Sequence, residues 1–312
     1  MEEDKIPLVA VAGPTASGKT ALAVELALRL GGEVISADSM QIYKGMDIAT
    51  AKPTAAEQKG VPHHLIGFLE PTEEFSVADY AVLAHRTIRE VHERGKLPIL
   101  AGGTGLYLDA VVNNISFAEI ETDSALRAEL AGLAREQGTE CLLEELRAVD
   151  PESAARLHPH NLARIIRAVE VYRLTGIPMS EHQRRSRLTP RLYRTALLGL
   201  NFRDRQRLYD RIDLRVDRML EAGLLEEARQ VLAQDSLKTA RQAIGYKELI
   251  PYFAGEETLA EAVGRIKQES RRYAKRQLTW FRRNERINWI YIDDCQNMEE
   301  IVAKAVEKVK VL

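Results

Sequence analysis

Cysteine is nearly absent from this chain, since only Cys141 and Cys295 occur among its 312 residues and no C-x-x-C pair is present. A disulfide framework and a structural zinc site are therefore not expected, and a reducing cytoplasm is the expected compartment. No run approaches the roughly 18 apolar residues of a membrane helix. The acidic residues 1–5 lead straight into a strand pattern and do not resemble a secretory signal. We therefore expect no membrane partner.

A large net charge is also lacking, because 44 Lys and Arg residues nearly balance 46 Asp and Glu residues. The hydrophobic content of 45% is typical of a chain that folds around a sizeable core. The balance conceals segments of opposite sign. Residues 119–152 hold ten acidic and three basic residues, 160–194 hold eight arginines and two glutamates, and 265–286 hold nine Lys and Arg residues and two glutamates. These basic segments indicate either a polyanionic partner larger than a nucleotide or solvated helix faces.

The clearest pattern that is present is G-x-x-x-x-G-K-[ST] at residues 13–20, between an apolar strand pattern and a helical pattern. In such a P-loop, glycines let backbone N–H groups surround a phosphate at the positive end of a helix. Lys19 is expected to contact the terminal phosphates, and the Thr20 hydroxyl to bind Mg²⁺ as cofactor. The residues predicted to bind a diphosphate or nucleotide are Gly13, Pro14, Thr15, Ala16, Ser17, Gly18, Lys19 and Thr20. The motif predicts phosphate binding without fixing the reaction.

Strand and helix patterns alternate along the first hundred residues, which predicts an α/β fold with a doubly wound, mostly parallel sheet and flanking helices. The predicted strands are 8–12, 33–37, 64–68, 98–101, 193–200 and 289–292, and the main helices are 21–30, 76–94, 160–174, 203–221, 258–283 and 298–311. Residues 123–146 are helical and acidic, with no strand pattern. We predict a P-loop core at 1–115 and 159–312, a helical insertion domain at 116–158, and a mobile basic loop at 180–190.

Two polar residues follow predicted strands at the edge of the sheet where the P-loop lies. Asp38 is either a carboxylate associated with Mg²⁺ or a general base that accepts a proton from a nucleophile, unless it only caps a turn. Thr104 lies in the glycine-rich run 102–107. Those glycines either permit close approach to a ligand or form a tight turn.

Charged side chains recur at helical spacing in the predicted helix 203–221. One face carries Arg207, Arg211, Arg215 and Arg218, and an adjoining face carries Asp210, Asp213 and Asp217. The pattern indicates either a ladder of ion pairs within the helix or an arginine that clamps a pyrophosphate.

The aromatic and the histidine side chains can each have either a structural or a functional role. Residues 271–283 interleave cations with aromatics, which leaves the cations for nucleic-acid phosphates while the aromatics are partly in the core. The histidines at 63, 64, 158 and 160 are candidate metal ligands. Adjacent histidines in a strand point to opposite sides, so we expect structural roles.

Taken together, several stretches resemble the bacterial tRNA dimethylallyltransferase (tRNA isopentenyltransferase) family. The matching stretches are 13–20, 35–44, 47–53, 61–65, 102–107, 163–170, 241–247 and 272–282, which span nearly the whole chain. The resemblance implies transfer of the dimethylallyl group from dimethylallyl diphosphate to N6 of the adenosine 3′-adjacent to the anticodon of tRNA, with release of pyrophosphate. It also implies that the base is flipped out of the loop. Ala49 replaces a frequent glycine, and the zinc finger of eukaryotic relatives is missing, so a bacterial-type form is implied.

The resemblance also implies roles for individual residues. Those with catalytic roles are Asp38, Thr104 and Arg211, with Asp38 as the base at the adenine N6. Those matching tRNA-binding stretches are Asp38, Ser39, Met40, Gln41, Thr104, Arg127, Ala163, Arg164, Ile165, Ile166, Arg167, Gln242, Ala243, Ile244, Gly245, Tyr246 and Lys247. The expected partners are thus tRNA and dimethylallyl diphosphate, and we expect a monomer.

Other functions remain as alternatives at this point. A P-loop small-molecule kinase, or an enzyme that prenylates free adenylate, explains the P-loop but not the basic segments. A nucleotide switch that binds RNA is disfavoured because neither D-x-x-G nor N-K-x-D occurs.

Overall fold

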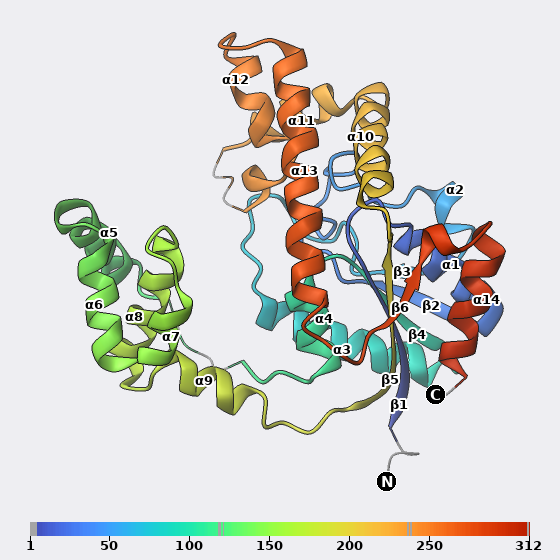
Figure 1. Ribbon diagram of the computed structural model, residues 1–312, viewed down its shortest axis with the longest axis horizontal. Coiled ribbons are helices and arrows are strands. Elements are labelled where there is room, and N and C mark those ends of the chain that lie inside the picture. The colour runs from blue at the N-terminus through green and yellow to red at the C-terminus, as the bar shows by residue number, and fades with distance from the viewer. Residues whose placement is uncertain (1–4, 118–119, 121, 236, 238, 311) are drawn as a thin grey trace. The chain divides into compact units, whose positions relative to one another are not determined.

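The computed structural model describes residues 5–117, 120, 122–235, 237, 239–310 and 312. The chain divides into two compact units, one formed by Met1–Val112 with Arg191–Leu312 and the other by Asn113–Pro190 (Figure 1). Each unit is described by itself below. None of the described helices is both long enough and apolar enough to cross a lipid bilayer.

The first unit is built on a six-stranded sheet in the order β3-β2-β4-β1-β5-β6, in which all pairings are parallel. The strands are β1 (Ile6–Ala12), β2 (Gly32–Ser36), β3 (His63–His64), β4 (Leu97–Ala101), β5 (Tyr193–Asn201) and β6 (Asn288–Tyr291). The predicted doubly wound parallel sheet is confirmed. Because β1, β2 and β4 run in the same direction, the loops that follow them meet at one edge.

The strand predicted at 64–68 is wrong beyond His64. Leu65 and Gly67 have positive φ angles of 58° and 57°, which end the extended backbone. The N–H groups of Gly67 and Phe68 instead donate to the carbonyls of Gln41 and Ile42. The apolar run therefore fastens the loop after β2.

The helices of the first unit are α1 (Lys19–Leu30), α2 (Ala55–Gln58), α3 (Val77–Glu93), α4 (Gly105–Val112), α10 (Arg205–Glu221), α11 (Leu224–Leu232), α12 (Ile250–Phe253), α13 (Leu259–Phe281) and α14 (Met298–Val309), with 3-10 turns at Ala240–Gln242, Lys247–Leu249 and Ile292–Asp294. Helices α3 and α4 cover one face of the sheet and α1 and α14 the other, whereas α10, α11 and α12 pack with the loop after β2 in a third hydrophobic core. Ser76 caps α3 in a capping box with Asp79. Thr258 and Glu261 form the same box at α13.

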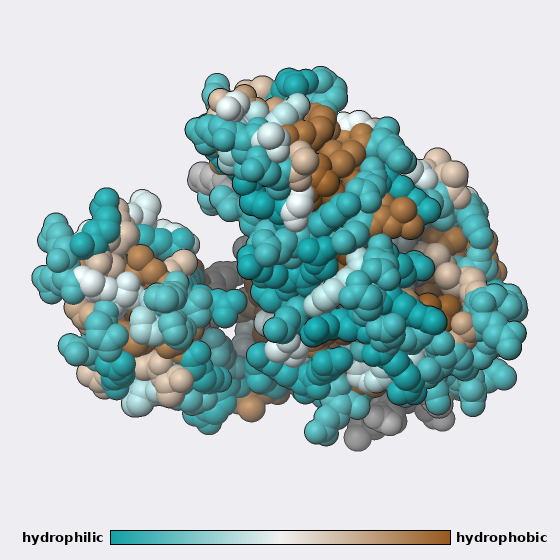
Figure 2. All heavy atoms as spheres, turned by 45° about the horizontal axis from the view of Figure 1, so that its top comes forward, coloured by the Kyte–Doolittle hydropathy of each residue, from teal (hydrophilic) through white to brown (hydrophobic). Residues whose placement is uncertain are grey.

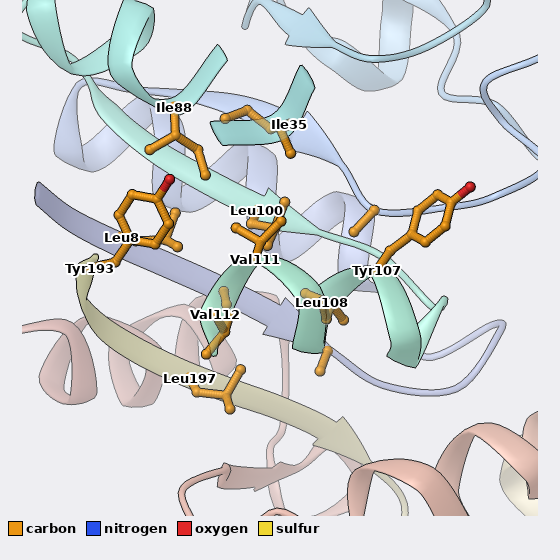
Figure 3. Packing of buried hydrophobic residues seen from close by; sticks show 14 of the residues in the cluster. Leu8, Ile35, Ile88, Leu100, Tyr107, Leu108, Val111, Val112, Tyr193 and Leu197 are labelled. Carbon is orange, nitrogen blue, oxygen red and sulfur yellow. The ribbon is translucent and has the colours of Figure 1, made fainter. Parts of the chain in front are cut away.

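Successive residues of β1 enter two different hydrophobic cores. Leu8, Ala10 and Ala12 belong to the core beneath α3 and α4, which Figure 3 shows with Leu100, Val111 and Leu197 among its members. Val9 and Val11 belong to the opposite core beneath α1 and α14. Burying such aliphatic side chains contributes about 1.5–3 kcal/mol each. A strand buried on both faces fixes the position of the loop that follows it.

The second unit consists of α5 (Ser124–Gln137), α6 (Thr139–Val149), α7 (Pro151–Arg156), α8 (Leu162–Thr175) and α9 (Met179–Ser186). It is larger than the predicted insertion at 116–158. The reason is that Ile165 and Val169 of α8 share a core with Leu130 and Leu142 of the acidic helices. The change from acidic to basic composition therefore separates helices that pack together, and it does not mark a domain boundary.

Ion pairs join the two charge segments within the second unit. Arg173 of α8 pairs bidentately with Glu145, at 2.8 Å for each contact, and with Glu129 at 3.1 Å. The loop predicted at 180–190 is partly helical, because Glu181 pairs with Arg184 and Arg185 within α9. On the face that Figure 2 draws, hydrophilic residues predominate and hydrophobic ones gather in separate areas.

Candidate active site

The P-loop begins where β1 ends and closes where α1 begins. Gly13 and Gly18 have φ angles of 150° and 83°. A Cβ atom on Gly13 would lie 2.7 Å from the Leu200 carbonyl oxygen and 2.9 Å from Ser17 Oγ, so only glycine fits there. The first N–H groups of α1 have no partner within the helix and lie at its positive end. The glycine conformations and the helix N-terminus expected of a P-loop are therefore present, and binding of a diphosphate there stays a prediction.

Lys19, the first residue of α1, folds back over the loop. Its Nζ donates to the Pro14 carbonyl oxygen at 2.8 Å. Desolvation, followed by repulsion from Arg215, lowers the pKa of Lys19 to about 7, although Asp38 opposes the shift. An anion bound in the loop would favour the charged form of this lysine.

Asp38 lies in the loop after β2. Its Oδ1 accepts hydrogen bonds from the backbone N–H groups of Met40, at 2.9 Å, and Gln41, at 3.4 Å. One carboxylate oxygen thus caps the turn, whereas Oδ2 accepts no hydrogen bond from the residues that the structure describes. Capping the turn fixes the orientation of the carboxylate, so it is compatible with a chemical role for the second oxygen.

Thr104 connects the loop after β4 to the loop after β2. Its Oγ1 accepts from the Ser39 N–H at 3.0 Å and donates to Ser39 Oγ at 3.2 Å. A Cβ on Gly102 would lie 2.1 Å from the Ala37 carbonyl oxygen. The close approach that glycine permits here is between two backbone segments. Thr104 itself lines neither cavity among the described residues.

Two adjoining cavities open at this edge of the sheet. One has a volume of about 260 Å³ and the other about 70 Å³. The residues that line both are Thr15, Asp38, Thr50, Arg215 and Tyr273. The smaller cavity is completed by polar P-loop residues, Lys19 and Thr20. The larger cavity has apolar walls from Ile212, Val216, Ile244 and Ile266. Asp38 therefore stands where a polar, cationic compartment meets a larger, partly apolar one.

Of the arginines on α10, the structure brings Arg215 rather than Arg211 into these cavities. Arg211 is exposed, donates from Nε to the Ala16 carbonyl oxygen at 3.0 Å, and lines a separate pocket with Ser17 and Gly18. Arg215 lies one turn later, and burial lowers its pKa. Arg211 thus lies at the P-loop but outside the two cavities that Asp38 lines, and its catalytic role stays a prediction.

Two of the three aspartates of α10 pair with a neighbouring helix, whereas Asp210 accepts from Gln206 within α10 at 2.8 Å. Asp213 accepts two hydrogen bonds from Arg271 of α13, at 2.5 and 2.7 Å, and Asp217 pairs with Lys267 at 2.6 Å. The ladder within one helix is therefore wrong for these two aspartates. Pairing between helices fastens α10 to α13 (Figure 1) and uses part of the basic segment 265–286.

Gln277 is a site residue whose role the sequence did not reveal. It is 6% exposed, its Oε1 accepts from the Thr15 N–H at 2.8 Å, and its Nε2 donates to the Gly103 carbonyl oxygen at 2.9 Å. The amide thus joins the P-loop to the loop after β4. Its one signal in the sequence is a polar residue on the side of the helix that carries Tyr273 and Trp280.

The residues predicted to bind tRNA fall in both units. In the first unit, the larger cavity is lined by Ser39, Met40, Gln242, Ala243, Ile244, Gly245 and Lys247, and the smaller cavity by Gln41. Tyr246 is fully buried, and its hydroxyl donates to Glu227 at 2.7 Å. Its side chain is therefore a poor candidate for RNA contact.

In the second unit, Ala163 and Arg164 are exposed, whereas Ile165 and Ile166 are buried in its core. The side chains of Arg127 and Arg167 donate to the fully buried Glu170, at 3.0 and 2.7 Å. Burial opposes ionisation of Glu170, but these hydrogen bonds outweigh it and lower the pKa. The two arginines thus have fixed positions on the surface.

The histidines have structural partners. His64 Nε2 lies 2.7 Å from Glu33 Oε2, which Arg94 also contacts at 2.6 Å, and His63 Nδ1 lies 2.8 Å from the Val61 carbonyl oxygen. The rings of His158 and His160 pack edge to face. Among the described residues, no three His, Cys, Asp or Glu side chains are grouped to hold a metal ion.

Comparison with known proteins identifies relatives along nearly the whole chain. Residues 41–284 match the model of the family described as IPP transferase. The tRNA dimethylallyltransferase of Thermoanaerobacter sp. (strain X514) is 49% identical over 300 residues, which cover 95% of each chain. That of Geobacillus thermodenitrificans is 53% identical over 289 residues, covering 92% of this chain and 91% of the relative.

Solved structures show the same fold. The full-length tRNA isopentenylpyrophosphate transferase from Bacillus halodurans is 46% identical, covers 98% of both chains and has a TM-score of 0.73. A eukaryotic dimethylallyltransferase, described as acting on tRNA, is 31% identical with a TM-score of 0.73, covering 88% of this chain and 70% of its own. On the family match and these identities, the chain belongs to the IPP transferase family.

Proposed function

We propose that the protein transfers the dimethylallyl group of dimethylallyl diphosphate to N6 of the adenosine 3′-adjacent to the anticodon of tRNA, releasing pyrophosphate. The observation that carries this proposal is the position of Asp38, which lines both the cationic cavity and the larger, partly apolar cavity. The names of the relatives support the same reaction. Dimethylallyl diphosphate needs a site of this double character, because one end is anionic and the other apolar.

The P-loop end of the site suits the departing diphosphate. Lys19 and Arg215 provide two cations at the smaller cavity, and the N-terminus of α1 adds N–H donors. These groups stabilise the charge that develops on the leaving oxygen as its bond to carbon breaks. Because they are fixed by Pro14 and Thr50 before substrate arrives, little reorganisation is required.

The carboxylate end of the site suits the nucleophile. In the proposed displacement, N6 of adenine forms a bond to the first carbon of the dimethylallyl group while the bond to the diphosphate oxygen breaks. Asp38 Oδ2 accepts the proton that N6 loses. Holding both reactants in line supplies much of the rate enhancement.

Mg²⁺ fits the smaller cavity as a partner of the diphosphate. Thr20 lines this cavity beside Asp38, and no cluster of three acidic, His or Cys side chains occurs among the described residues. The Thr20 hydroxyl would hold the ion, with the remaining positions taken by water and diphosphate oxygens. When bound, Mg²⁺ would neutralise charge on the leaving group.

The tRNA would contact the wall formed by residues 242–247 and, in the second unit, the cations Arg127, Arg164 and Arg167. Phosphate contacts of this kind position an RNA without reading its sequence. We also propose that the protein acts in the cytoplasm as a monomer.

The test is incubation of the protein with labelled dimethylallyl diphosphate and unmodified tRNA, followed by digestion to nucleosides. The expected product is N6-dimethylallyladenosine, formed from tRNA and not from free AMP. Label in AMP alone would instead support an adenylate prenyltransferase. Consumption of ATP without transfer to RNA would support a small-molecule kinase.

A further inference from the structure

Glu227 is a half-buried carboxylate on α11 that lines neither cavity among the described residues. Its Oε2 accepts from the backbone N–H groups of Asp47 and Ile48, both at 2.7 Å. Its Oε1 accepts from the Ala49 N–H at 2.9 Å. Three consecutive N–H groups of one loop thus converge on a single carboxylate, so the loop depends on it for its conformation.

The carbonyl groups that follow in this loop hold two side chains of the site. The Thr50 oxygen accepts from Gln41 Nε2 at 3.2 Å and from the Arg215 guanidinium at 3.5 Å, and the Ala51 oxygen accepts from Gln41 Nε2 at 3.1 Å. Ala49, Thr50 and Ala51 also line the cavities themselves. The position of the loop therefore sets the position of Arg215 beside Lys19.

Glu227 also contacts the segment 242–247, which forms another wall of the larger cavity. Glu227 Oε1 accepts from the buried Tyr246 hydroxyl at 2.7 Å. Both neighbours of this tyrosine, Gly245 and Lys247, line the larger cavity. A Cβ on Gly245 would lie 3.4 Å from Ala49 Cβ, so the two segments meet directly.

We propose that Glu227 is a positioning residue that fixes both walls of the larger cavity at once, orienting Arg215 toward the diphosphate through the loop 47–51 and presenting residues 242–247 to the RNA through Tyr246. This inference rests on the proposed function. It assigns a role in substrate binding to a side chain that touches no substrate.

The test compares Glu227→Gln with the wild type in steady-state kinetics. An amide of the same shape keeps one acceptor oxygen and turns N–H₂ toward the remaining backbone N–H donors, so the contacts to the loop 47–51 weaken. Tyr246 can still pair with either end of the amide, because its hydroxyl both donates and accepts. We expect KM for dimethylallyl diphosphate to rise about tenfold, the size of one lost charge-assisted hydrogen bond, with kcat changed by about threefold or less and KM for tRNA changed less than KM for dimethylallyl diphosphate. Tyr246→Phe removes only the hydrogen bond from the Tyr246 hydroxyl to Glu227, and it is expected to raise KM for tRNA alone.

The matched control is Glu226→Gln, because Glu226 is the adjacent carboxylate on α11 and, among the residues that the structure describes, pairs only with Arg229 at 3.0 Å and Gln230 at 2.9 Å. It should leave both KM values unchanged. A purely structural role for Glu227 predicts lower melting temperature and lower kcat with wild-type KM values, and that result would overturn the proposal. If Glu227→Gln does not fold, wild-type KM for tRNA in Tyr246→Phe overturns it.

Binding of pyrophosphate, measured by calorimetry, separates this inference from the proposed function. If the wild type forms no prenylated tRNA, the proposed function fails, while weaker pyrophosphate binding by Glu227→Gln still supports the positioning of Arg215. Equal pyrophosphate affinity in the two proteins overturns that positioning, whatever reaction the protein catalyses.

Discussion

Two cations and one carboxylate, Lys19, Arg215 and Asp38, set the electrostatics of the site. Removal from water lowers the pKa of both cations, and the attraction of Asp38 only partly offsets this. Without an anion, the charged forms of the two buried cations therefore have a free-energy cost. A bound diphosphate removes the cost, and this explains in physical terms why the loop should select a highly charged ligand.

The lowered pKa of Lys19 predicts a pH dependence of diphosphate binding. With a pKa of about 7, Lys19 is mostly charged below pH 7 and mostly neutral above it. Since an anion binds the charged form, binding takes up a proton above pH 7, and affinity should fall with rising pH by up to about tenfold per unit. Calorimetric titration with pyrophosphate measures this slope. The Lys19→Arg variant, which stays charged, should lack it; an equal slope in both proteins would contradict the assignment.

Arg215 and Arg211 should differ in how much they contribute to the binding of dimethylallyl diphosphate. Arg215→Met removes a cation that lines both cavities, so KM for dimethylallyl diphosphate should rise about tenfold to a hundredfold. Arg211→Met removes a contact to the Ala16 carbonyl and should have a smaller effect. Steady-state kinetics with saturating tRNA compares them directly. A larger effect at Arg211 would instead identify that residue as the diphosphate clamp.

At the scale of elements, α13 and the loops after β1, β2 and β4 form one assembly. Gln277 joins the P-loop to Gly103, and Trp280 Nε1 donates to Asp109 Oδ2 at 2.8 Å. Glycines in the run 102–105 make room for these contacts, since a Cβ on Gly105 would lie 2.3 Å from the Trp280 ring. The loop that carries Thr104 is thus held from two sides.

Gly102→Ala should therefore destabilise the first unit. The added Cβ would meet the Ala37 backbone, which cannot yield as a flexible side chain would, so a loss of about 1–3 kcal/mol in the free energy of unfolding is expected. Thermal denaturation measures the change. The control is Gly264→Ala in α13, where nothing lies within 4 Å and a gain of up to about 1 kcal/mol is expected. Equal melting temperatures for both variants would contradict the packing argument.

Sequence patterns predicted most helices and strands well, but they predicted the directions of individual side chains less well. The P-loop and five of the predicted strands follow from local rules of glycine geometry and hydrophobic periodicity. Helical spacing places Arg211 and Arg215 on one face, but only the packing of α10 determines which of them reaches the cavity. Gln277 and Glu227 bind backbone groups far away in the sequence, and no local pattern encodes such contacts.

At the scale of the whole molecule, some of the basic residues in the two basic segments form ion pairs with acidic residues of the protein itself. Arg173 and Arg271 neutralise carboxylates within their own units. Charge counts along the sequence could not reveal this, because pairing depends on which helices pack together. Arg164 remains exposed and forms no ion pair with a described residue.

Arg164→Ala should weaken tRNA binding without changing diphosphate binding. Loss of one phosphate contact lowers affinity for all tRNA sequences alike and reduces the salt slope of binding by about one. Filter binding at several salt concentrations measures this. Arg147→Ala, which removes an exposed arginine of the same unit paired with Glu140 at 2.7 Å, is the control. An unchanged salt slope in Arg164→Ala would exclude this arginine from the RNA contact.

The central claim, that Asp38 takes the proton from adenine N6 while the P-loop holds the departing diphosphate, is tested most directly by a single-turnover measurement. Wild type and Asp38→Asn are each mixed with saturating dimethylallyl diphosphate and tRNA, and formation of N6-dimethylallyladenosine is followed in time. The account predicts a rate constant lower by about 10² to 10⁴ in the variant while both substrates still bind. A rate constant equal to that of the wild type would contradict it.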